Sequence, residues 1–282
     1  MEDDELESYW NYVALEAKDF EKMVRIEKWK KAARNWLADY ADKRAYDFVL
    51  GVIDKVAKLN GSASVLDVGC GPGKWSVLFA KRYSSVTAID ISPNMIQLAK
   101  ENAGRQNLRN INFCVMPVSR LDIPDETFDL VNCITVLQHI FSDEDWRLAI
   151  HEMTRVTRKG GHILLFEAAP NFAVKRRTPH LSIRTMRQYI DEFRKAKAQL
   201  ICWRAADLSL PVTLLGLKYY AASFNRRVYY FISKRKSLPP AFLSLLSWIA
   251  VLLAWQIDYK LAETPLSFLS IGRILLFRKA KT

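Results

Sequence analysis

The stretch Val65–Gly73 constrains this chain most, because a short apolar segment there meets an aspartate and three glycines spaced two apart. Apolar β-forming residues that end in a glycine-rich turn predict a buried parallel strand leading into a helix. Glycines at such a turn let a ligand lie close to the backbone, since no Cβ stands in the way. The pattern is D-x-G-x-G-x-G, with Asp67 two residues before Gly69, and not the G-x-G-x-x-G that cradles a pyrophosphate. A carboxylate there suits a cationic ligand, such as the ammonium of an amino acid, better than a phosphate.

A second acidic residue ends the next apolar stretch along the chain. The segment Val86–Asp90 reads as a strand, and Asp90 comes 17 residues after Gly73. A carboxylate at the end of the second strand of an α/β unit suits bidentate hydrogen bonding to ribose hydroxyls. Ser92 and Pro93 then predict a helix start, with serine as the N-cap and proline in the first turn. The glycine turn, the strand-end aspartate and the Ser-Pro pair form a specific signal when they occur in this order.

Strand-like and helical patterns alternate along much of the chain. The expected strands are 64–68, 86–89, 112–116, 130–134 and 162–166, and the expected helices are 75–81, 94–102 and 143–156, after a helical stretch over 13–59. Strands separated by helices of roughly 10–15 residues predict a parallel sheet with helices on both faces. After Ala168 the pattern predicts a helix over Ser182–Lys197 with Ser182 as its N-cap, a strand over 200–206 and a closing strand over 271–277.

These motifs resemble those of the class I S-adenosylmethionine-dependent methyltransferases, in particular the subgroup that includes many small-molecule and lipid-quinone enzymes. The matching stretches are Val65–Gly73, Val86–Met95, Leu121–Val131 and Val136–Ile140, with the turn Arg158–Gly161 before the strand 162–166. The resemblance covers residues 60–168 well and the rest loosely. It implies an α/β fold with a Rossmann-like, seven-stranded, mostly parallel sheet, helices on both faces and an antiparallel last strand.

The resemblance also divides the chain into four parts. Residues 1–59 are expected to form an N-terminal helical cap over the cofactor pocket, and residues 60–208 the S-adenosylmethionine-binding α/β core. Residues 209–264 are expected to be a basic and apolar insertion before the last strand, acting as a lid or a membrane-interface element. Residues 265–282 are expected to contribute the closing strand.

S-adenosylmethionine is the cofactor that the resemblance implies, and it assigns roles to particular residues. Asp67 is expected to bond, directly or through water, to the amino group of the methionyl part, and Asp90 to the ribose hydroxyls; ordinary capping acids at strand ends are the plainer alternative. The other expected cofactor contacts are Gly69, Cys70 and Gly71 through their backbone, Ile91 and Met95 beside the adenine, Pro117, Val118 and Ser119 at the adenine edge, and Thr135 under the methionyl part. The family often has an acid where this chain has Pro117, so backbone atoms of Val118 and Ser119 would have to bind the adenine amino group, or that contact is missing.

Histidine is the candidate for proton transfer. Methyl transfer needs a base only if the acceptor must lose a proton. His139 follows the fourth expected strand, at the carboxyl edge of the sheet where α/β sites lie, so it is the first candidate for the catalytic residue. A role in local packing is the alternative, and His180 is the second candidate. The four cysteines form no C-x-x-C spacing and no Cys/His cluster, so no metal site is predicted.

The positive charge is concentrated in the C-terminal third. Between Lys175 and Lys236 there are fifteen Lys and Arg residues and three acids, an excess equal to the net charge of +12 of the whole chain. This asymmetry suggests an anionic partner, and a solvated basic face that binds no ligand is the alternative. The basic region is followed by Ser237–Ile257, 21 residues without a charge. A true membrane span would put the closing strand on the far side of the bilayer. An interfacial helix on anionic lipid and a buried lid over an apolar acceptor are therefore the favoured alternatives.

The function expected from these features is methyl transfer from S-adenosylmethionine to a small or lipid-linked acceptor, with an anionic membrane surface as a candidate partner. The alternative is an RNA (tRNA or rRNA) methyltransferase that uses the basic third, although no RNA-binding module is recognisable. A non-catalytic cofactor-binding protein is a third reading, which the intact glycine and aspartate positions disfavour. The acidic N-terminus does not resemble a signal peptide, so a cytoplasmic protein, peripheral at the membrane, is expected.

Overall fold

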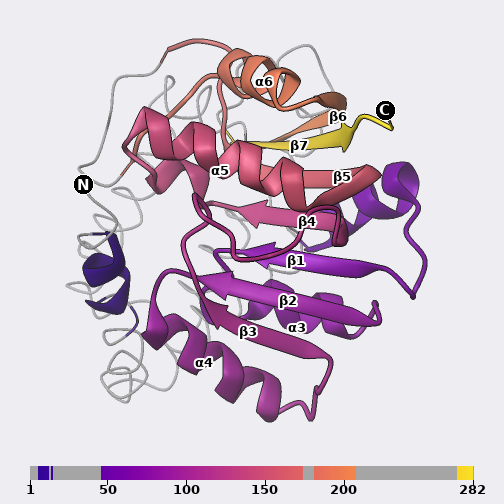
Figure 1. Ribbon diagram of the computed structural model, residues 1–282, viewed down its shortest axis with the longest axis vertical. Coiled ribbons are helices and arrows are strands. Elements are labelled where there is room, and N and C mark those ends of the chain that lie inside the picture. Colours follow the sequence, from indigo (N-terminus) through magenta and orange to yellow (C-terminus); the bar gives the residue numbers. More distant parts are fainter. Residues whose placement is uncertain (1–5, 13, 15–45, 174–180, 208–271, 282) are drawn as a thin grey trace, which may run out of the picture.

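The computed structural model describes residues 6–12, 14, 46–173, 181–207 and 272–281. At its centre is a seven-stranded sheet in the order β3-β2-β1-β4-β5-β7-β6 (Figure 1). The strands are β1 (Ser64–Val68), β2 (Ser85–Asp90), β3 (Ile111–Val115), β4 (Phe128–Ile134), β5 (Thr157–Ala168), β6 (Ala198–Asp207) and β7 (Gly272–Lys279). Neighbours among β1 to β5 are parallel, whereas β7 is antiparallel to both β5 and β6. The predicted α/β fold class is therefore confirmed.

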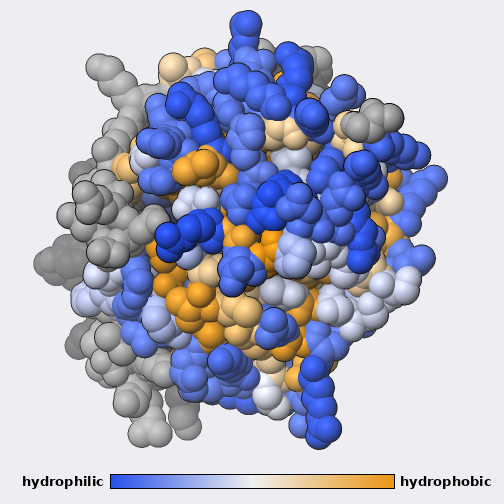
Figure 2. Space-filling model, viewed as in Figure 1, coloured by the Kyte–Doolittle hydropathy of each residue, from blue (hydrophilic) through white to orange (hydrophobic). Residues whose placement is uncertain are grey.

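Helices cover both faces of this sheet. One face carries α3 (Lys74–Ala80), α4 (Pro93–Gly104), the helical residues 46–52 and the π-helical turn η2 (Ile53–Ala57); the other carries α5 (Asp143–Val156) and α6 (Met186–Lys195). In Figure 1, α5 lies in front of the sheet and α3 behind it. Figure 2 shows that the α5 side of the molecule is largely hydrophilic, with apolar side chains visible in patches between the elements.

Alternate strand residues supply hydrophobic cores on both faces of the sheet. In β1, Leu66 and Val68 pack in the same core as Trp146 of α5, whereas Val65 packs with Phe79 of α3. All three β1 residues are almost completely buried. Burial on both faces explains why the strands read as continuous apolar runs in the sequence.

Side-chain caps fix where α4 and α6 begin. The Ser92 hydroxyl accepts a hydrogen bond from the backbone N–H of Met95 at the start of α4, as predicted. For α6 the predicted N-cap is wrong: the helix begins at Met186, and Thr185 forms a capping box with Gln188. The backbone N–H of Ser182 instead donates to the carbonyl of Gln138, 2.7 Å away, so a tertiary contact holds it outside the helix.

The predicted turn Arg158–Gly161 is also corrected. These residues lie inside β5, which begins at Thr157, and the pairing with β4 shifts register between Phe128 and Leu130. Gly160 has φ +74°, a left-handed conformation that glycine adopts without steric cost. The segment is therefore a bulge within a longer strand.

Some predictions concern residues outside the described ranges. They are most of the expected helical stretch 13–59, His180, and the insertion 209–264 with its uncharged run Ser237–Ile257, and they stay predictions. Of the expected N-terminal cap, residues 6–12, 14 and 46–52 are described as helical. No helix in the described part of the chain has the length and apolarity needed to cross a membrane.

Candidate functional site

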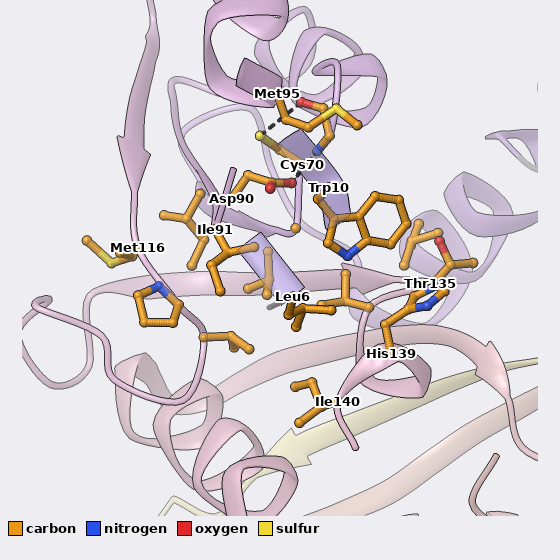
Figure 3. Close-up of a pocket in the computed structure, with 18 of the residues that line it drawn as sticks. Leu6, Trp10, Cys70, Asp90, Ile91, Met95, Met116, Thr135, His139 and Ile140 are labelled. Carbon is orange, nitrogen blue, oxygen red and sulfur yellow. Dashed lines mark hydrogen bonds between the residues drawn. The ribbon is translucent and has the colours of Figure 1, made fainter. Parts of the chain in front are cut away.

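A pocket of about 290 Å³ lies where β1, β2 and β4 end, at the carboxyl edge of the parallel strands (Figure 3). This is the edge at which open α/β sheets bind ligands. The volume is near the lower end of the ~300–1,000 Å³ range of small-molecule sites. The predicted site residues that line this pocket are Gly69, Cys70, Gly71, Asp90, Ile91, Met95, Pro117, Val118, Ser119, Thr135 and His139. Asp67 is absent from the lining.

The glycine turn after β1 forms one wall of the pocket. Gly69, Gly71 and Gly73 all have positive φ, at +61°, +51° and +81°. A Cβ on Gly69 would lie 2.3 Å from the Cγ2 atom of Val136, and one on Gly73 would lie 2.9 Å from the Cβ of Ala99. A Cβ on Gly71 would meet nothing within 4 Å. Two glycines are therefore required by packing within the protein, whereas Gly71 borders open space beside the pocket.

Asp90, at the end of β2, connects the two strand ends that flank the pocket. Its Oδ2 accepts a hydrogen bond from the Gly71 N–H at 2.9 Å, and its Oδ1 accepts one from the Ser92 N–H at 2.9 Å. Burial raises the pKa of Asp90, while these two N–H donors act to lower it. The carboxylate thus holds the glycine turn against the start of α4. It also lines the pocket, where its oxygens can accept further hydrogen bonds.

Asp67 lies behind the pocket wall. Alternation along β1 turns its side chain towards α3, where its carboxylate accepts hydrogen bonds from the Ser76 hydroxyl at 2.6 Å and from the Asn132 side-chain amide at 2.8 Å. Burial raises the pKa of Asp67 to about 6, although both hydrogen bonds act to lower it. Asp67 therefore anchors the strand beneath the turn, and its predicted contact with a cofactor stays a prediction.

The segment after β4 forms the neighbouring wall of the pocket, beside the glycine turn. Thr135 has φ +57°, and its N–H donates to the carbonyl of Phe166 on β5 at 2.8 Å. A short 3-10 turn, η3 (Leu137–His139), follows and places His139 in the pocket lining. The left-handed residue and the 3-10 turn follow the end of β4, and this segment contributes Thr135, Val136, His139 and Ile140 to the pocket lining.

The N-terminal helix (residues 6–12) contributes Leu6 and Trp10 to the pocket. Figure 3 shows the Trp10 ring inside the space bordered by Asp90, Thr135 and His139. The neighbouring Asn11 holds this helix on α4, because its side-chain oxygen accepts hydrogen bonds from the Ser92 hydroxyl at 2.6 Å and the Asn94 N–H at 3.4 Å. The helix therefore closes one side of the pocket.

Sequence reasoning missed part of the lining. The lining residues not predicted are Leu6, Trp10, Val68, Pro72, Lys74, Trp75, Ile89, Met116, Ile134, Val136, Ile140 and Asp145. Most of them adjoin a predicted residue in the sequence, so widening each motif by one or two positions would have found them. Leu6 and Trp10 carry no such signal, since they lie more than fifty positions before the glycine turn.

The remaining histidines of the described part lie away from this pocket. His151 on α5 pairs with Glu192, and His162 on β5 accepts a hydrogen bond from Arg278. Burial lowers the pKa of His162 to about 4, so it is neutral at pH 7. No group of three or more His, Cys, Asp or Glu side chains that could hold a metal ion occurs among the residues that the structure describes.

Comparison with known proteins agrees with this geometry. Residues 65–161 match the family model described as a methyltransferase domain. The uncharacterized methyltransferase YcgJ of Bacillus subtilis is 30% identical over 118 residues, which are 42% of this chain and 46% of that protein. The ubiquinone biosynthesis O-methyltransferase of Coxiella burnetii is 32% identical over 123 residues, 44% of this chain and 50% of that protein. The matches thus span about half the length of these relatives.

Solved structures show the same fold at lower identity. The crystal structure of the [4+2]-cyclase SpnF superposes with a TM-score of 0.58 at 22% identity, covering 85% of this chain and 82% of that one. At this identity the likeness concerns the fold alone.

Proposed function

Because this chain contains a class I S-adenosylmethionine-dependent methyltransferase domain, we propose that it transfers the methyl group of that cofactor to a small or lipid-linked acceptor. The observation that carries the proposal is the meeting of Asp90 and the positive-φ glycine turn at one pocket. A Cβ at Gly71 would extend into open space, as expected where a ligand approaches the backbone.

The pocket residues fit the parts of S-adenosylmethionine. Gly69, Cys70 and Gly71 would accommodate the methionyl part, and the Asp90 carboxylate would accept hydrogen bonds from the ribose hydroxyls. The remaining assignments are Ile91, Met95, Val118 and Ser119 around the adenine and Thr135 under the methionyl part. This arrangement would place the reactive end of the cofactor towards His139 and the N-terminal helix.

The protein's part in the reaction is to align the acceptor, exclude water and take up a proton where one is released. When bound, the cofactor supplies a methyl group on a positively charged sulfur, ready for displacement by a lone pair. His139 borders the pocket and would accept a proton from an acceptor hydroxyl. Alignment of the two reactants would supply a further part of the rate enhancement.

An apolar acceptor suits the pocket. Beside His139, the lining includes Leu6, Trp10, Val136 and Ile140. Among the described residues of this lining, Lys74 is the only lysine or arginine. A quinone ring or another apolar small molecule would bury its surface against these side chains. The similar Coxiella burnetii protein is named for ubiquinone biosynthesis, which agrees with this class of acceptor.

The insertion 209–264 would serve such an acceptor by bringing the enzyme to an anionic membrane surface. The basis for this part of the proposal is the sequence: the uncharged run Ser237–Ile257 follows the basic triplet Lys234–Lys236. An apolar helix beside a basic cluster is typical of segments that lie in the membrane interface.

The test is a screen with a donor carrying a labelled methyl group against lipid, quinone, sugar and RNA fractions, with calorimetric titration of S-adenosylhomocysteine beside it. We expect the ligand to bind and the label to enter a lipid or quinone fraction. A wild-type protein that binds neither S-adenosylmethionine nor S-adenosylhomocysteine would overturn the proposal. Label in the RNA fraction, with steep weakening of activity by salt, would favour RNA as the acceptor.

A further inference from the structure

Glu167, near the end of β5, is a buried carboxylate outside the pocket lining. Its Oε1 accepts hydrogen bonds from the N–H groups of Val136 at 2.7 Å and Leu137 at 3.0 Å, and its Oε2 accepts one from the N–H of Gln138 at 3.2 Å. Three consecutive backbone donors therefore converge on one side chain. They belong to the segment that forms the pocket wall after β4.

The carbonyl groups of the same segment have a cationic partner. Arg184 donates from Nη1 to the carbonyls of Leu137 at 3.4 Å and Ile140 at 2.9 Å. The guanidinium is itself fixed by the Asp143 carboxylate, 2.8 Å from Nη2, and lies 4.7 Å from the ring centroid of Trp146. The wall is thus held by an anion at its N–H groups and by a cation at its carbonyls.

This wall has little support of its own. η3 is a single 3-10 turn, and Thr135, directly before the anchored residues, has φ +57°. A non-glycine residue in the left-handed region persists only where its surroundings hold it there. Without Glu167, three N–H groups would lose their acceptor, and a buried donor without a partner destabilises the segment that carries it.

We propose that Glu167 is a positioning residue, which fixes the wall 135–140 so that Thr135 and His139 face the pocket in one arrangement. The expected effect on activity rests on the proposed function, because this wall would set the alignment of cofactor and acceptor. A displacement of about 1 Å in an aligned site lowers rates by about 10²-fold. Residues whose own position is locked by hydrogen bonds from behind give a site that precision.

The geometry makes the charge of Glu167 important as well as its size. A glutamine at this position could keep its oxygen on the N–H groups of Val136 and Leu137, but its NH₂ would then face the N–H of Gln138, donor against donor. Protonation of Glu167 would turn one of its oxygens into a hydroxyl, which donates as well as accepts. Burial raises the pKa of Glu167 to about 7, although the three N–H groups and Arg184 act to lower it.

The experiment compares Glu167→Gln with the matched control Glu192→Gln. Glu192 on α6 is also buried and paired, with His151 at 3.2 Å and Lys195 at 2.9 Å, but it lies outside the pocket lining. Amide hydrogen exchange, followed by NMR, should be about 10-fold faster or more at Val136, Leu137 and Gln138 in Glu167→Gln, because local opening then costs less. In Glu192→Gln these three amides should exchange as in the wild type.

A second readout is the environment of the His139 ring. The Trp10 ring meets it edge to face, so the His139 ring protons carry a ring-current shift. We expect Glu167→Gln to reduce that shift and to weaken S-adenosylhomocysteine binding about 10-fold, and Glu192→Gln to change neither. If Glu167 were only a general structural support, both variants would lower the melting temperature, and the ring-current shift of His139 would stay as in the wild type. That result would overturn the positioning role.

The outcomes separate the two proposals. If wild-type protein does not bind S-adenosylhomocysteine, the proposed function fails, whereas the exchange rates and the His139 shift still test Glu167. If Glu167→Gln folds and keeps wild-type exchange, His139 shift and affinity, the positioning role is overturned. If that variant does not fold, Glu167→Asp keeps the charge with one methylene fewer, and unchanged exchange at Val136 to Gln138 in this variant would equally overturn it.

Discussion

The rings of Trp10 and His139 meet edge to face across the pocket, with centroids 5.0 Å apart and planes at 88°. One ring comes from the N-terminal helix and the other from the turn after β4, far apart in the sequence. Edge-to-face aromatic pairs contribute ~0.5–1.5 kcal/mol beyond their buried area. This pair therefore closes the pocket and also restrains the histidine that the proposed chemistry requires.

Replacement of His139 tests its role as a base. His139→Ala should lower turnover by about 10²–10⁴-fold, the usual contribution of general acid–base catalysis, and change donor affinity much less. The measurement is kcat with the identified acceptor, beside calorimetric titration of S-adenosylhomocysteine. His151→Ala is the control, because His151 pairs with Glu192 outside the pocket. A loss of turnover below about threefold would leave His139 only a packing role.

The glycine turn predicts opposite effects at neighbouring positions. Gly71→Val should abolish donor binding and leave the fold near native, because its side chain would enter open space beside the pocket at the cost of a strained φ of +51°. Gly73→Val should instead destabilise the protein, because its Cβ would lie 2.9 Å from that of Ala99. Calorimetry and thermal unfolding separate the two effects. Gly104→Ala, where a Cβ meets nothing within 4 Å and φ is unstrained, is the control. Normal binding by a folded Gly71→Val protein would show that the ligand does not lie over this turn.

Most of the fold could be predicted because local signals and tertiary structure agree. β1 and α5 have the predicted bounds, and Ser92 caps α4 as the Ser-Pro pair indicates. The start of α6 was predicted wrongly because both Ser182 and Thr185 can cap a helix. The choice depends on Gln188, which completes a capping box, and on a hydrogen bond from Ser182 to a distant carbonyl.

The site was harder to predict, for reasons of direction and distance. The motif gave the position of Asp67 but not the direction of its side chain, which strand alternation turns to the α3 face, towards Ser76. Trp10 enters the pocket through contacts of Asn11 with Ser92 that no local pattern indicates. Glu167 was absent from the predictions because its partners are backbone N–H groups, which every residue except proline carries.

Asp90 should be necessary for donor binding. Asp90→Ala should weaken S-adenosylmethionine binding about 10-fold or more, since it removes charge-assisted hydrogen bonds of about 1.5–3 kcal/mol. The structure adds a second cause, because Asp90 also accepts from the Gly71 and Ser92 N–H groups. Asp90→Asn, which keeps one acceptor oxygen, should bind with intermediate affinity in the same titration. Unchanged affinity in a folded Asp90→Ala protein would remove Asp90 from the site.

The C-terminal insertion predicts two components of vesicle binding with different salt dependence. Attraction of basic residues to anionic lipid, about 1 kcal/mol for each, should weaken with salt, whereas apolar burial should persist. In liposome co-sedimentation, replacing Lys234, Arg235 and Lys236 by Gln should reduce binding to anionic vesicles only. Replacing Leu245, Ile249 and Leu252 by Ser should reduce binding to neutral vesicles too. A wild-type protein that stays in the supernatant under every lipid and salt condition rules out the membrane reading and favours the buried lid.

The buried Asp67 predicts a specific pH dependence of stability. Burial raises its pKa to about 6, above the usual value of 3.8, so the native state takes up a proton that the unfolded chain releases. The free energy of unfolding contributed by Asp67 therefore falls as the pH rises from about 4 to about 6, and stays low above that. Asp67→Asn removes this penalty, because an amide can accept from Asn132 and donate to Ser76 without carrying a charge. The melting temperature of the variant relative to wild type should thus be higher at pH 8 than at pH 5 by several degrees, since ~1 kcal/mol corresponds to ~2–4 °C in a protein of this size.

The matched control is Asp129→Asn, because the pKa of Asp129 is lowered whereas that of Asp67 is raised. Asp129 accepts hydrogen bonds from Ser64 and pairs with Arg158 at 2.6 Å, and these partners hold its pKa below the usual value against the effect of partial burial. The stability that Asp129 contributes is fully present above its pKa in the unfolded chain. This stability is lost only as the pH falls through the lowered pKa of the native state. Asp129→Asn should therefore lower the melting temperature by the same amount at pH 5 and pH 8. If the Asp67→Asn difference is equally constant between these two pH values, Asp67 is ionised throughout, and its carboxylate is held by Ser76 and Asn132 more strongly than burial disfavours it.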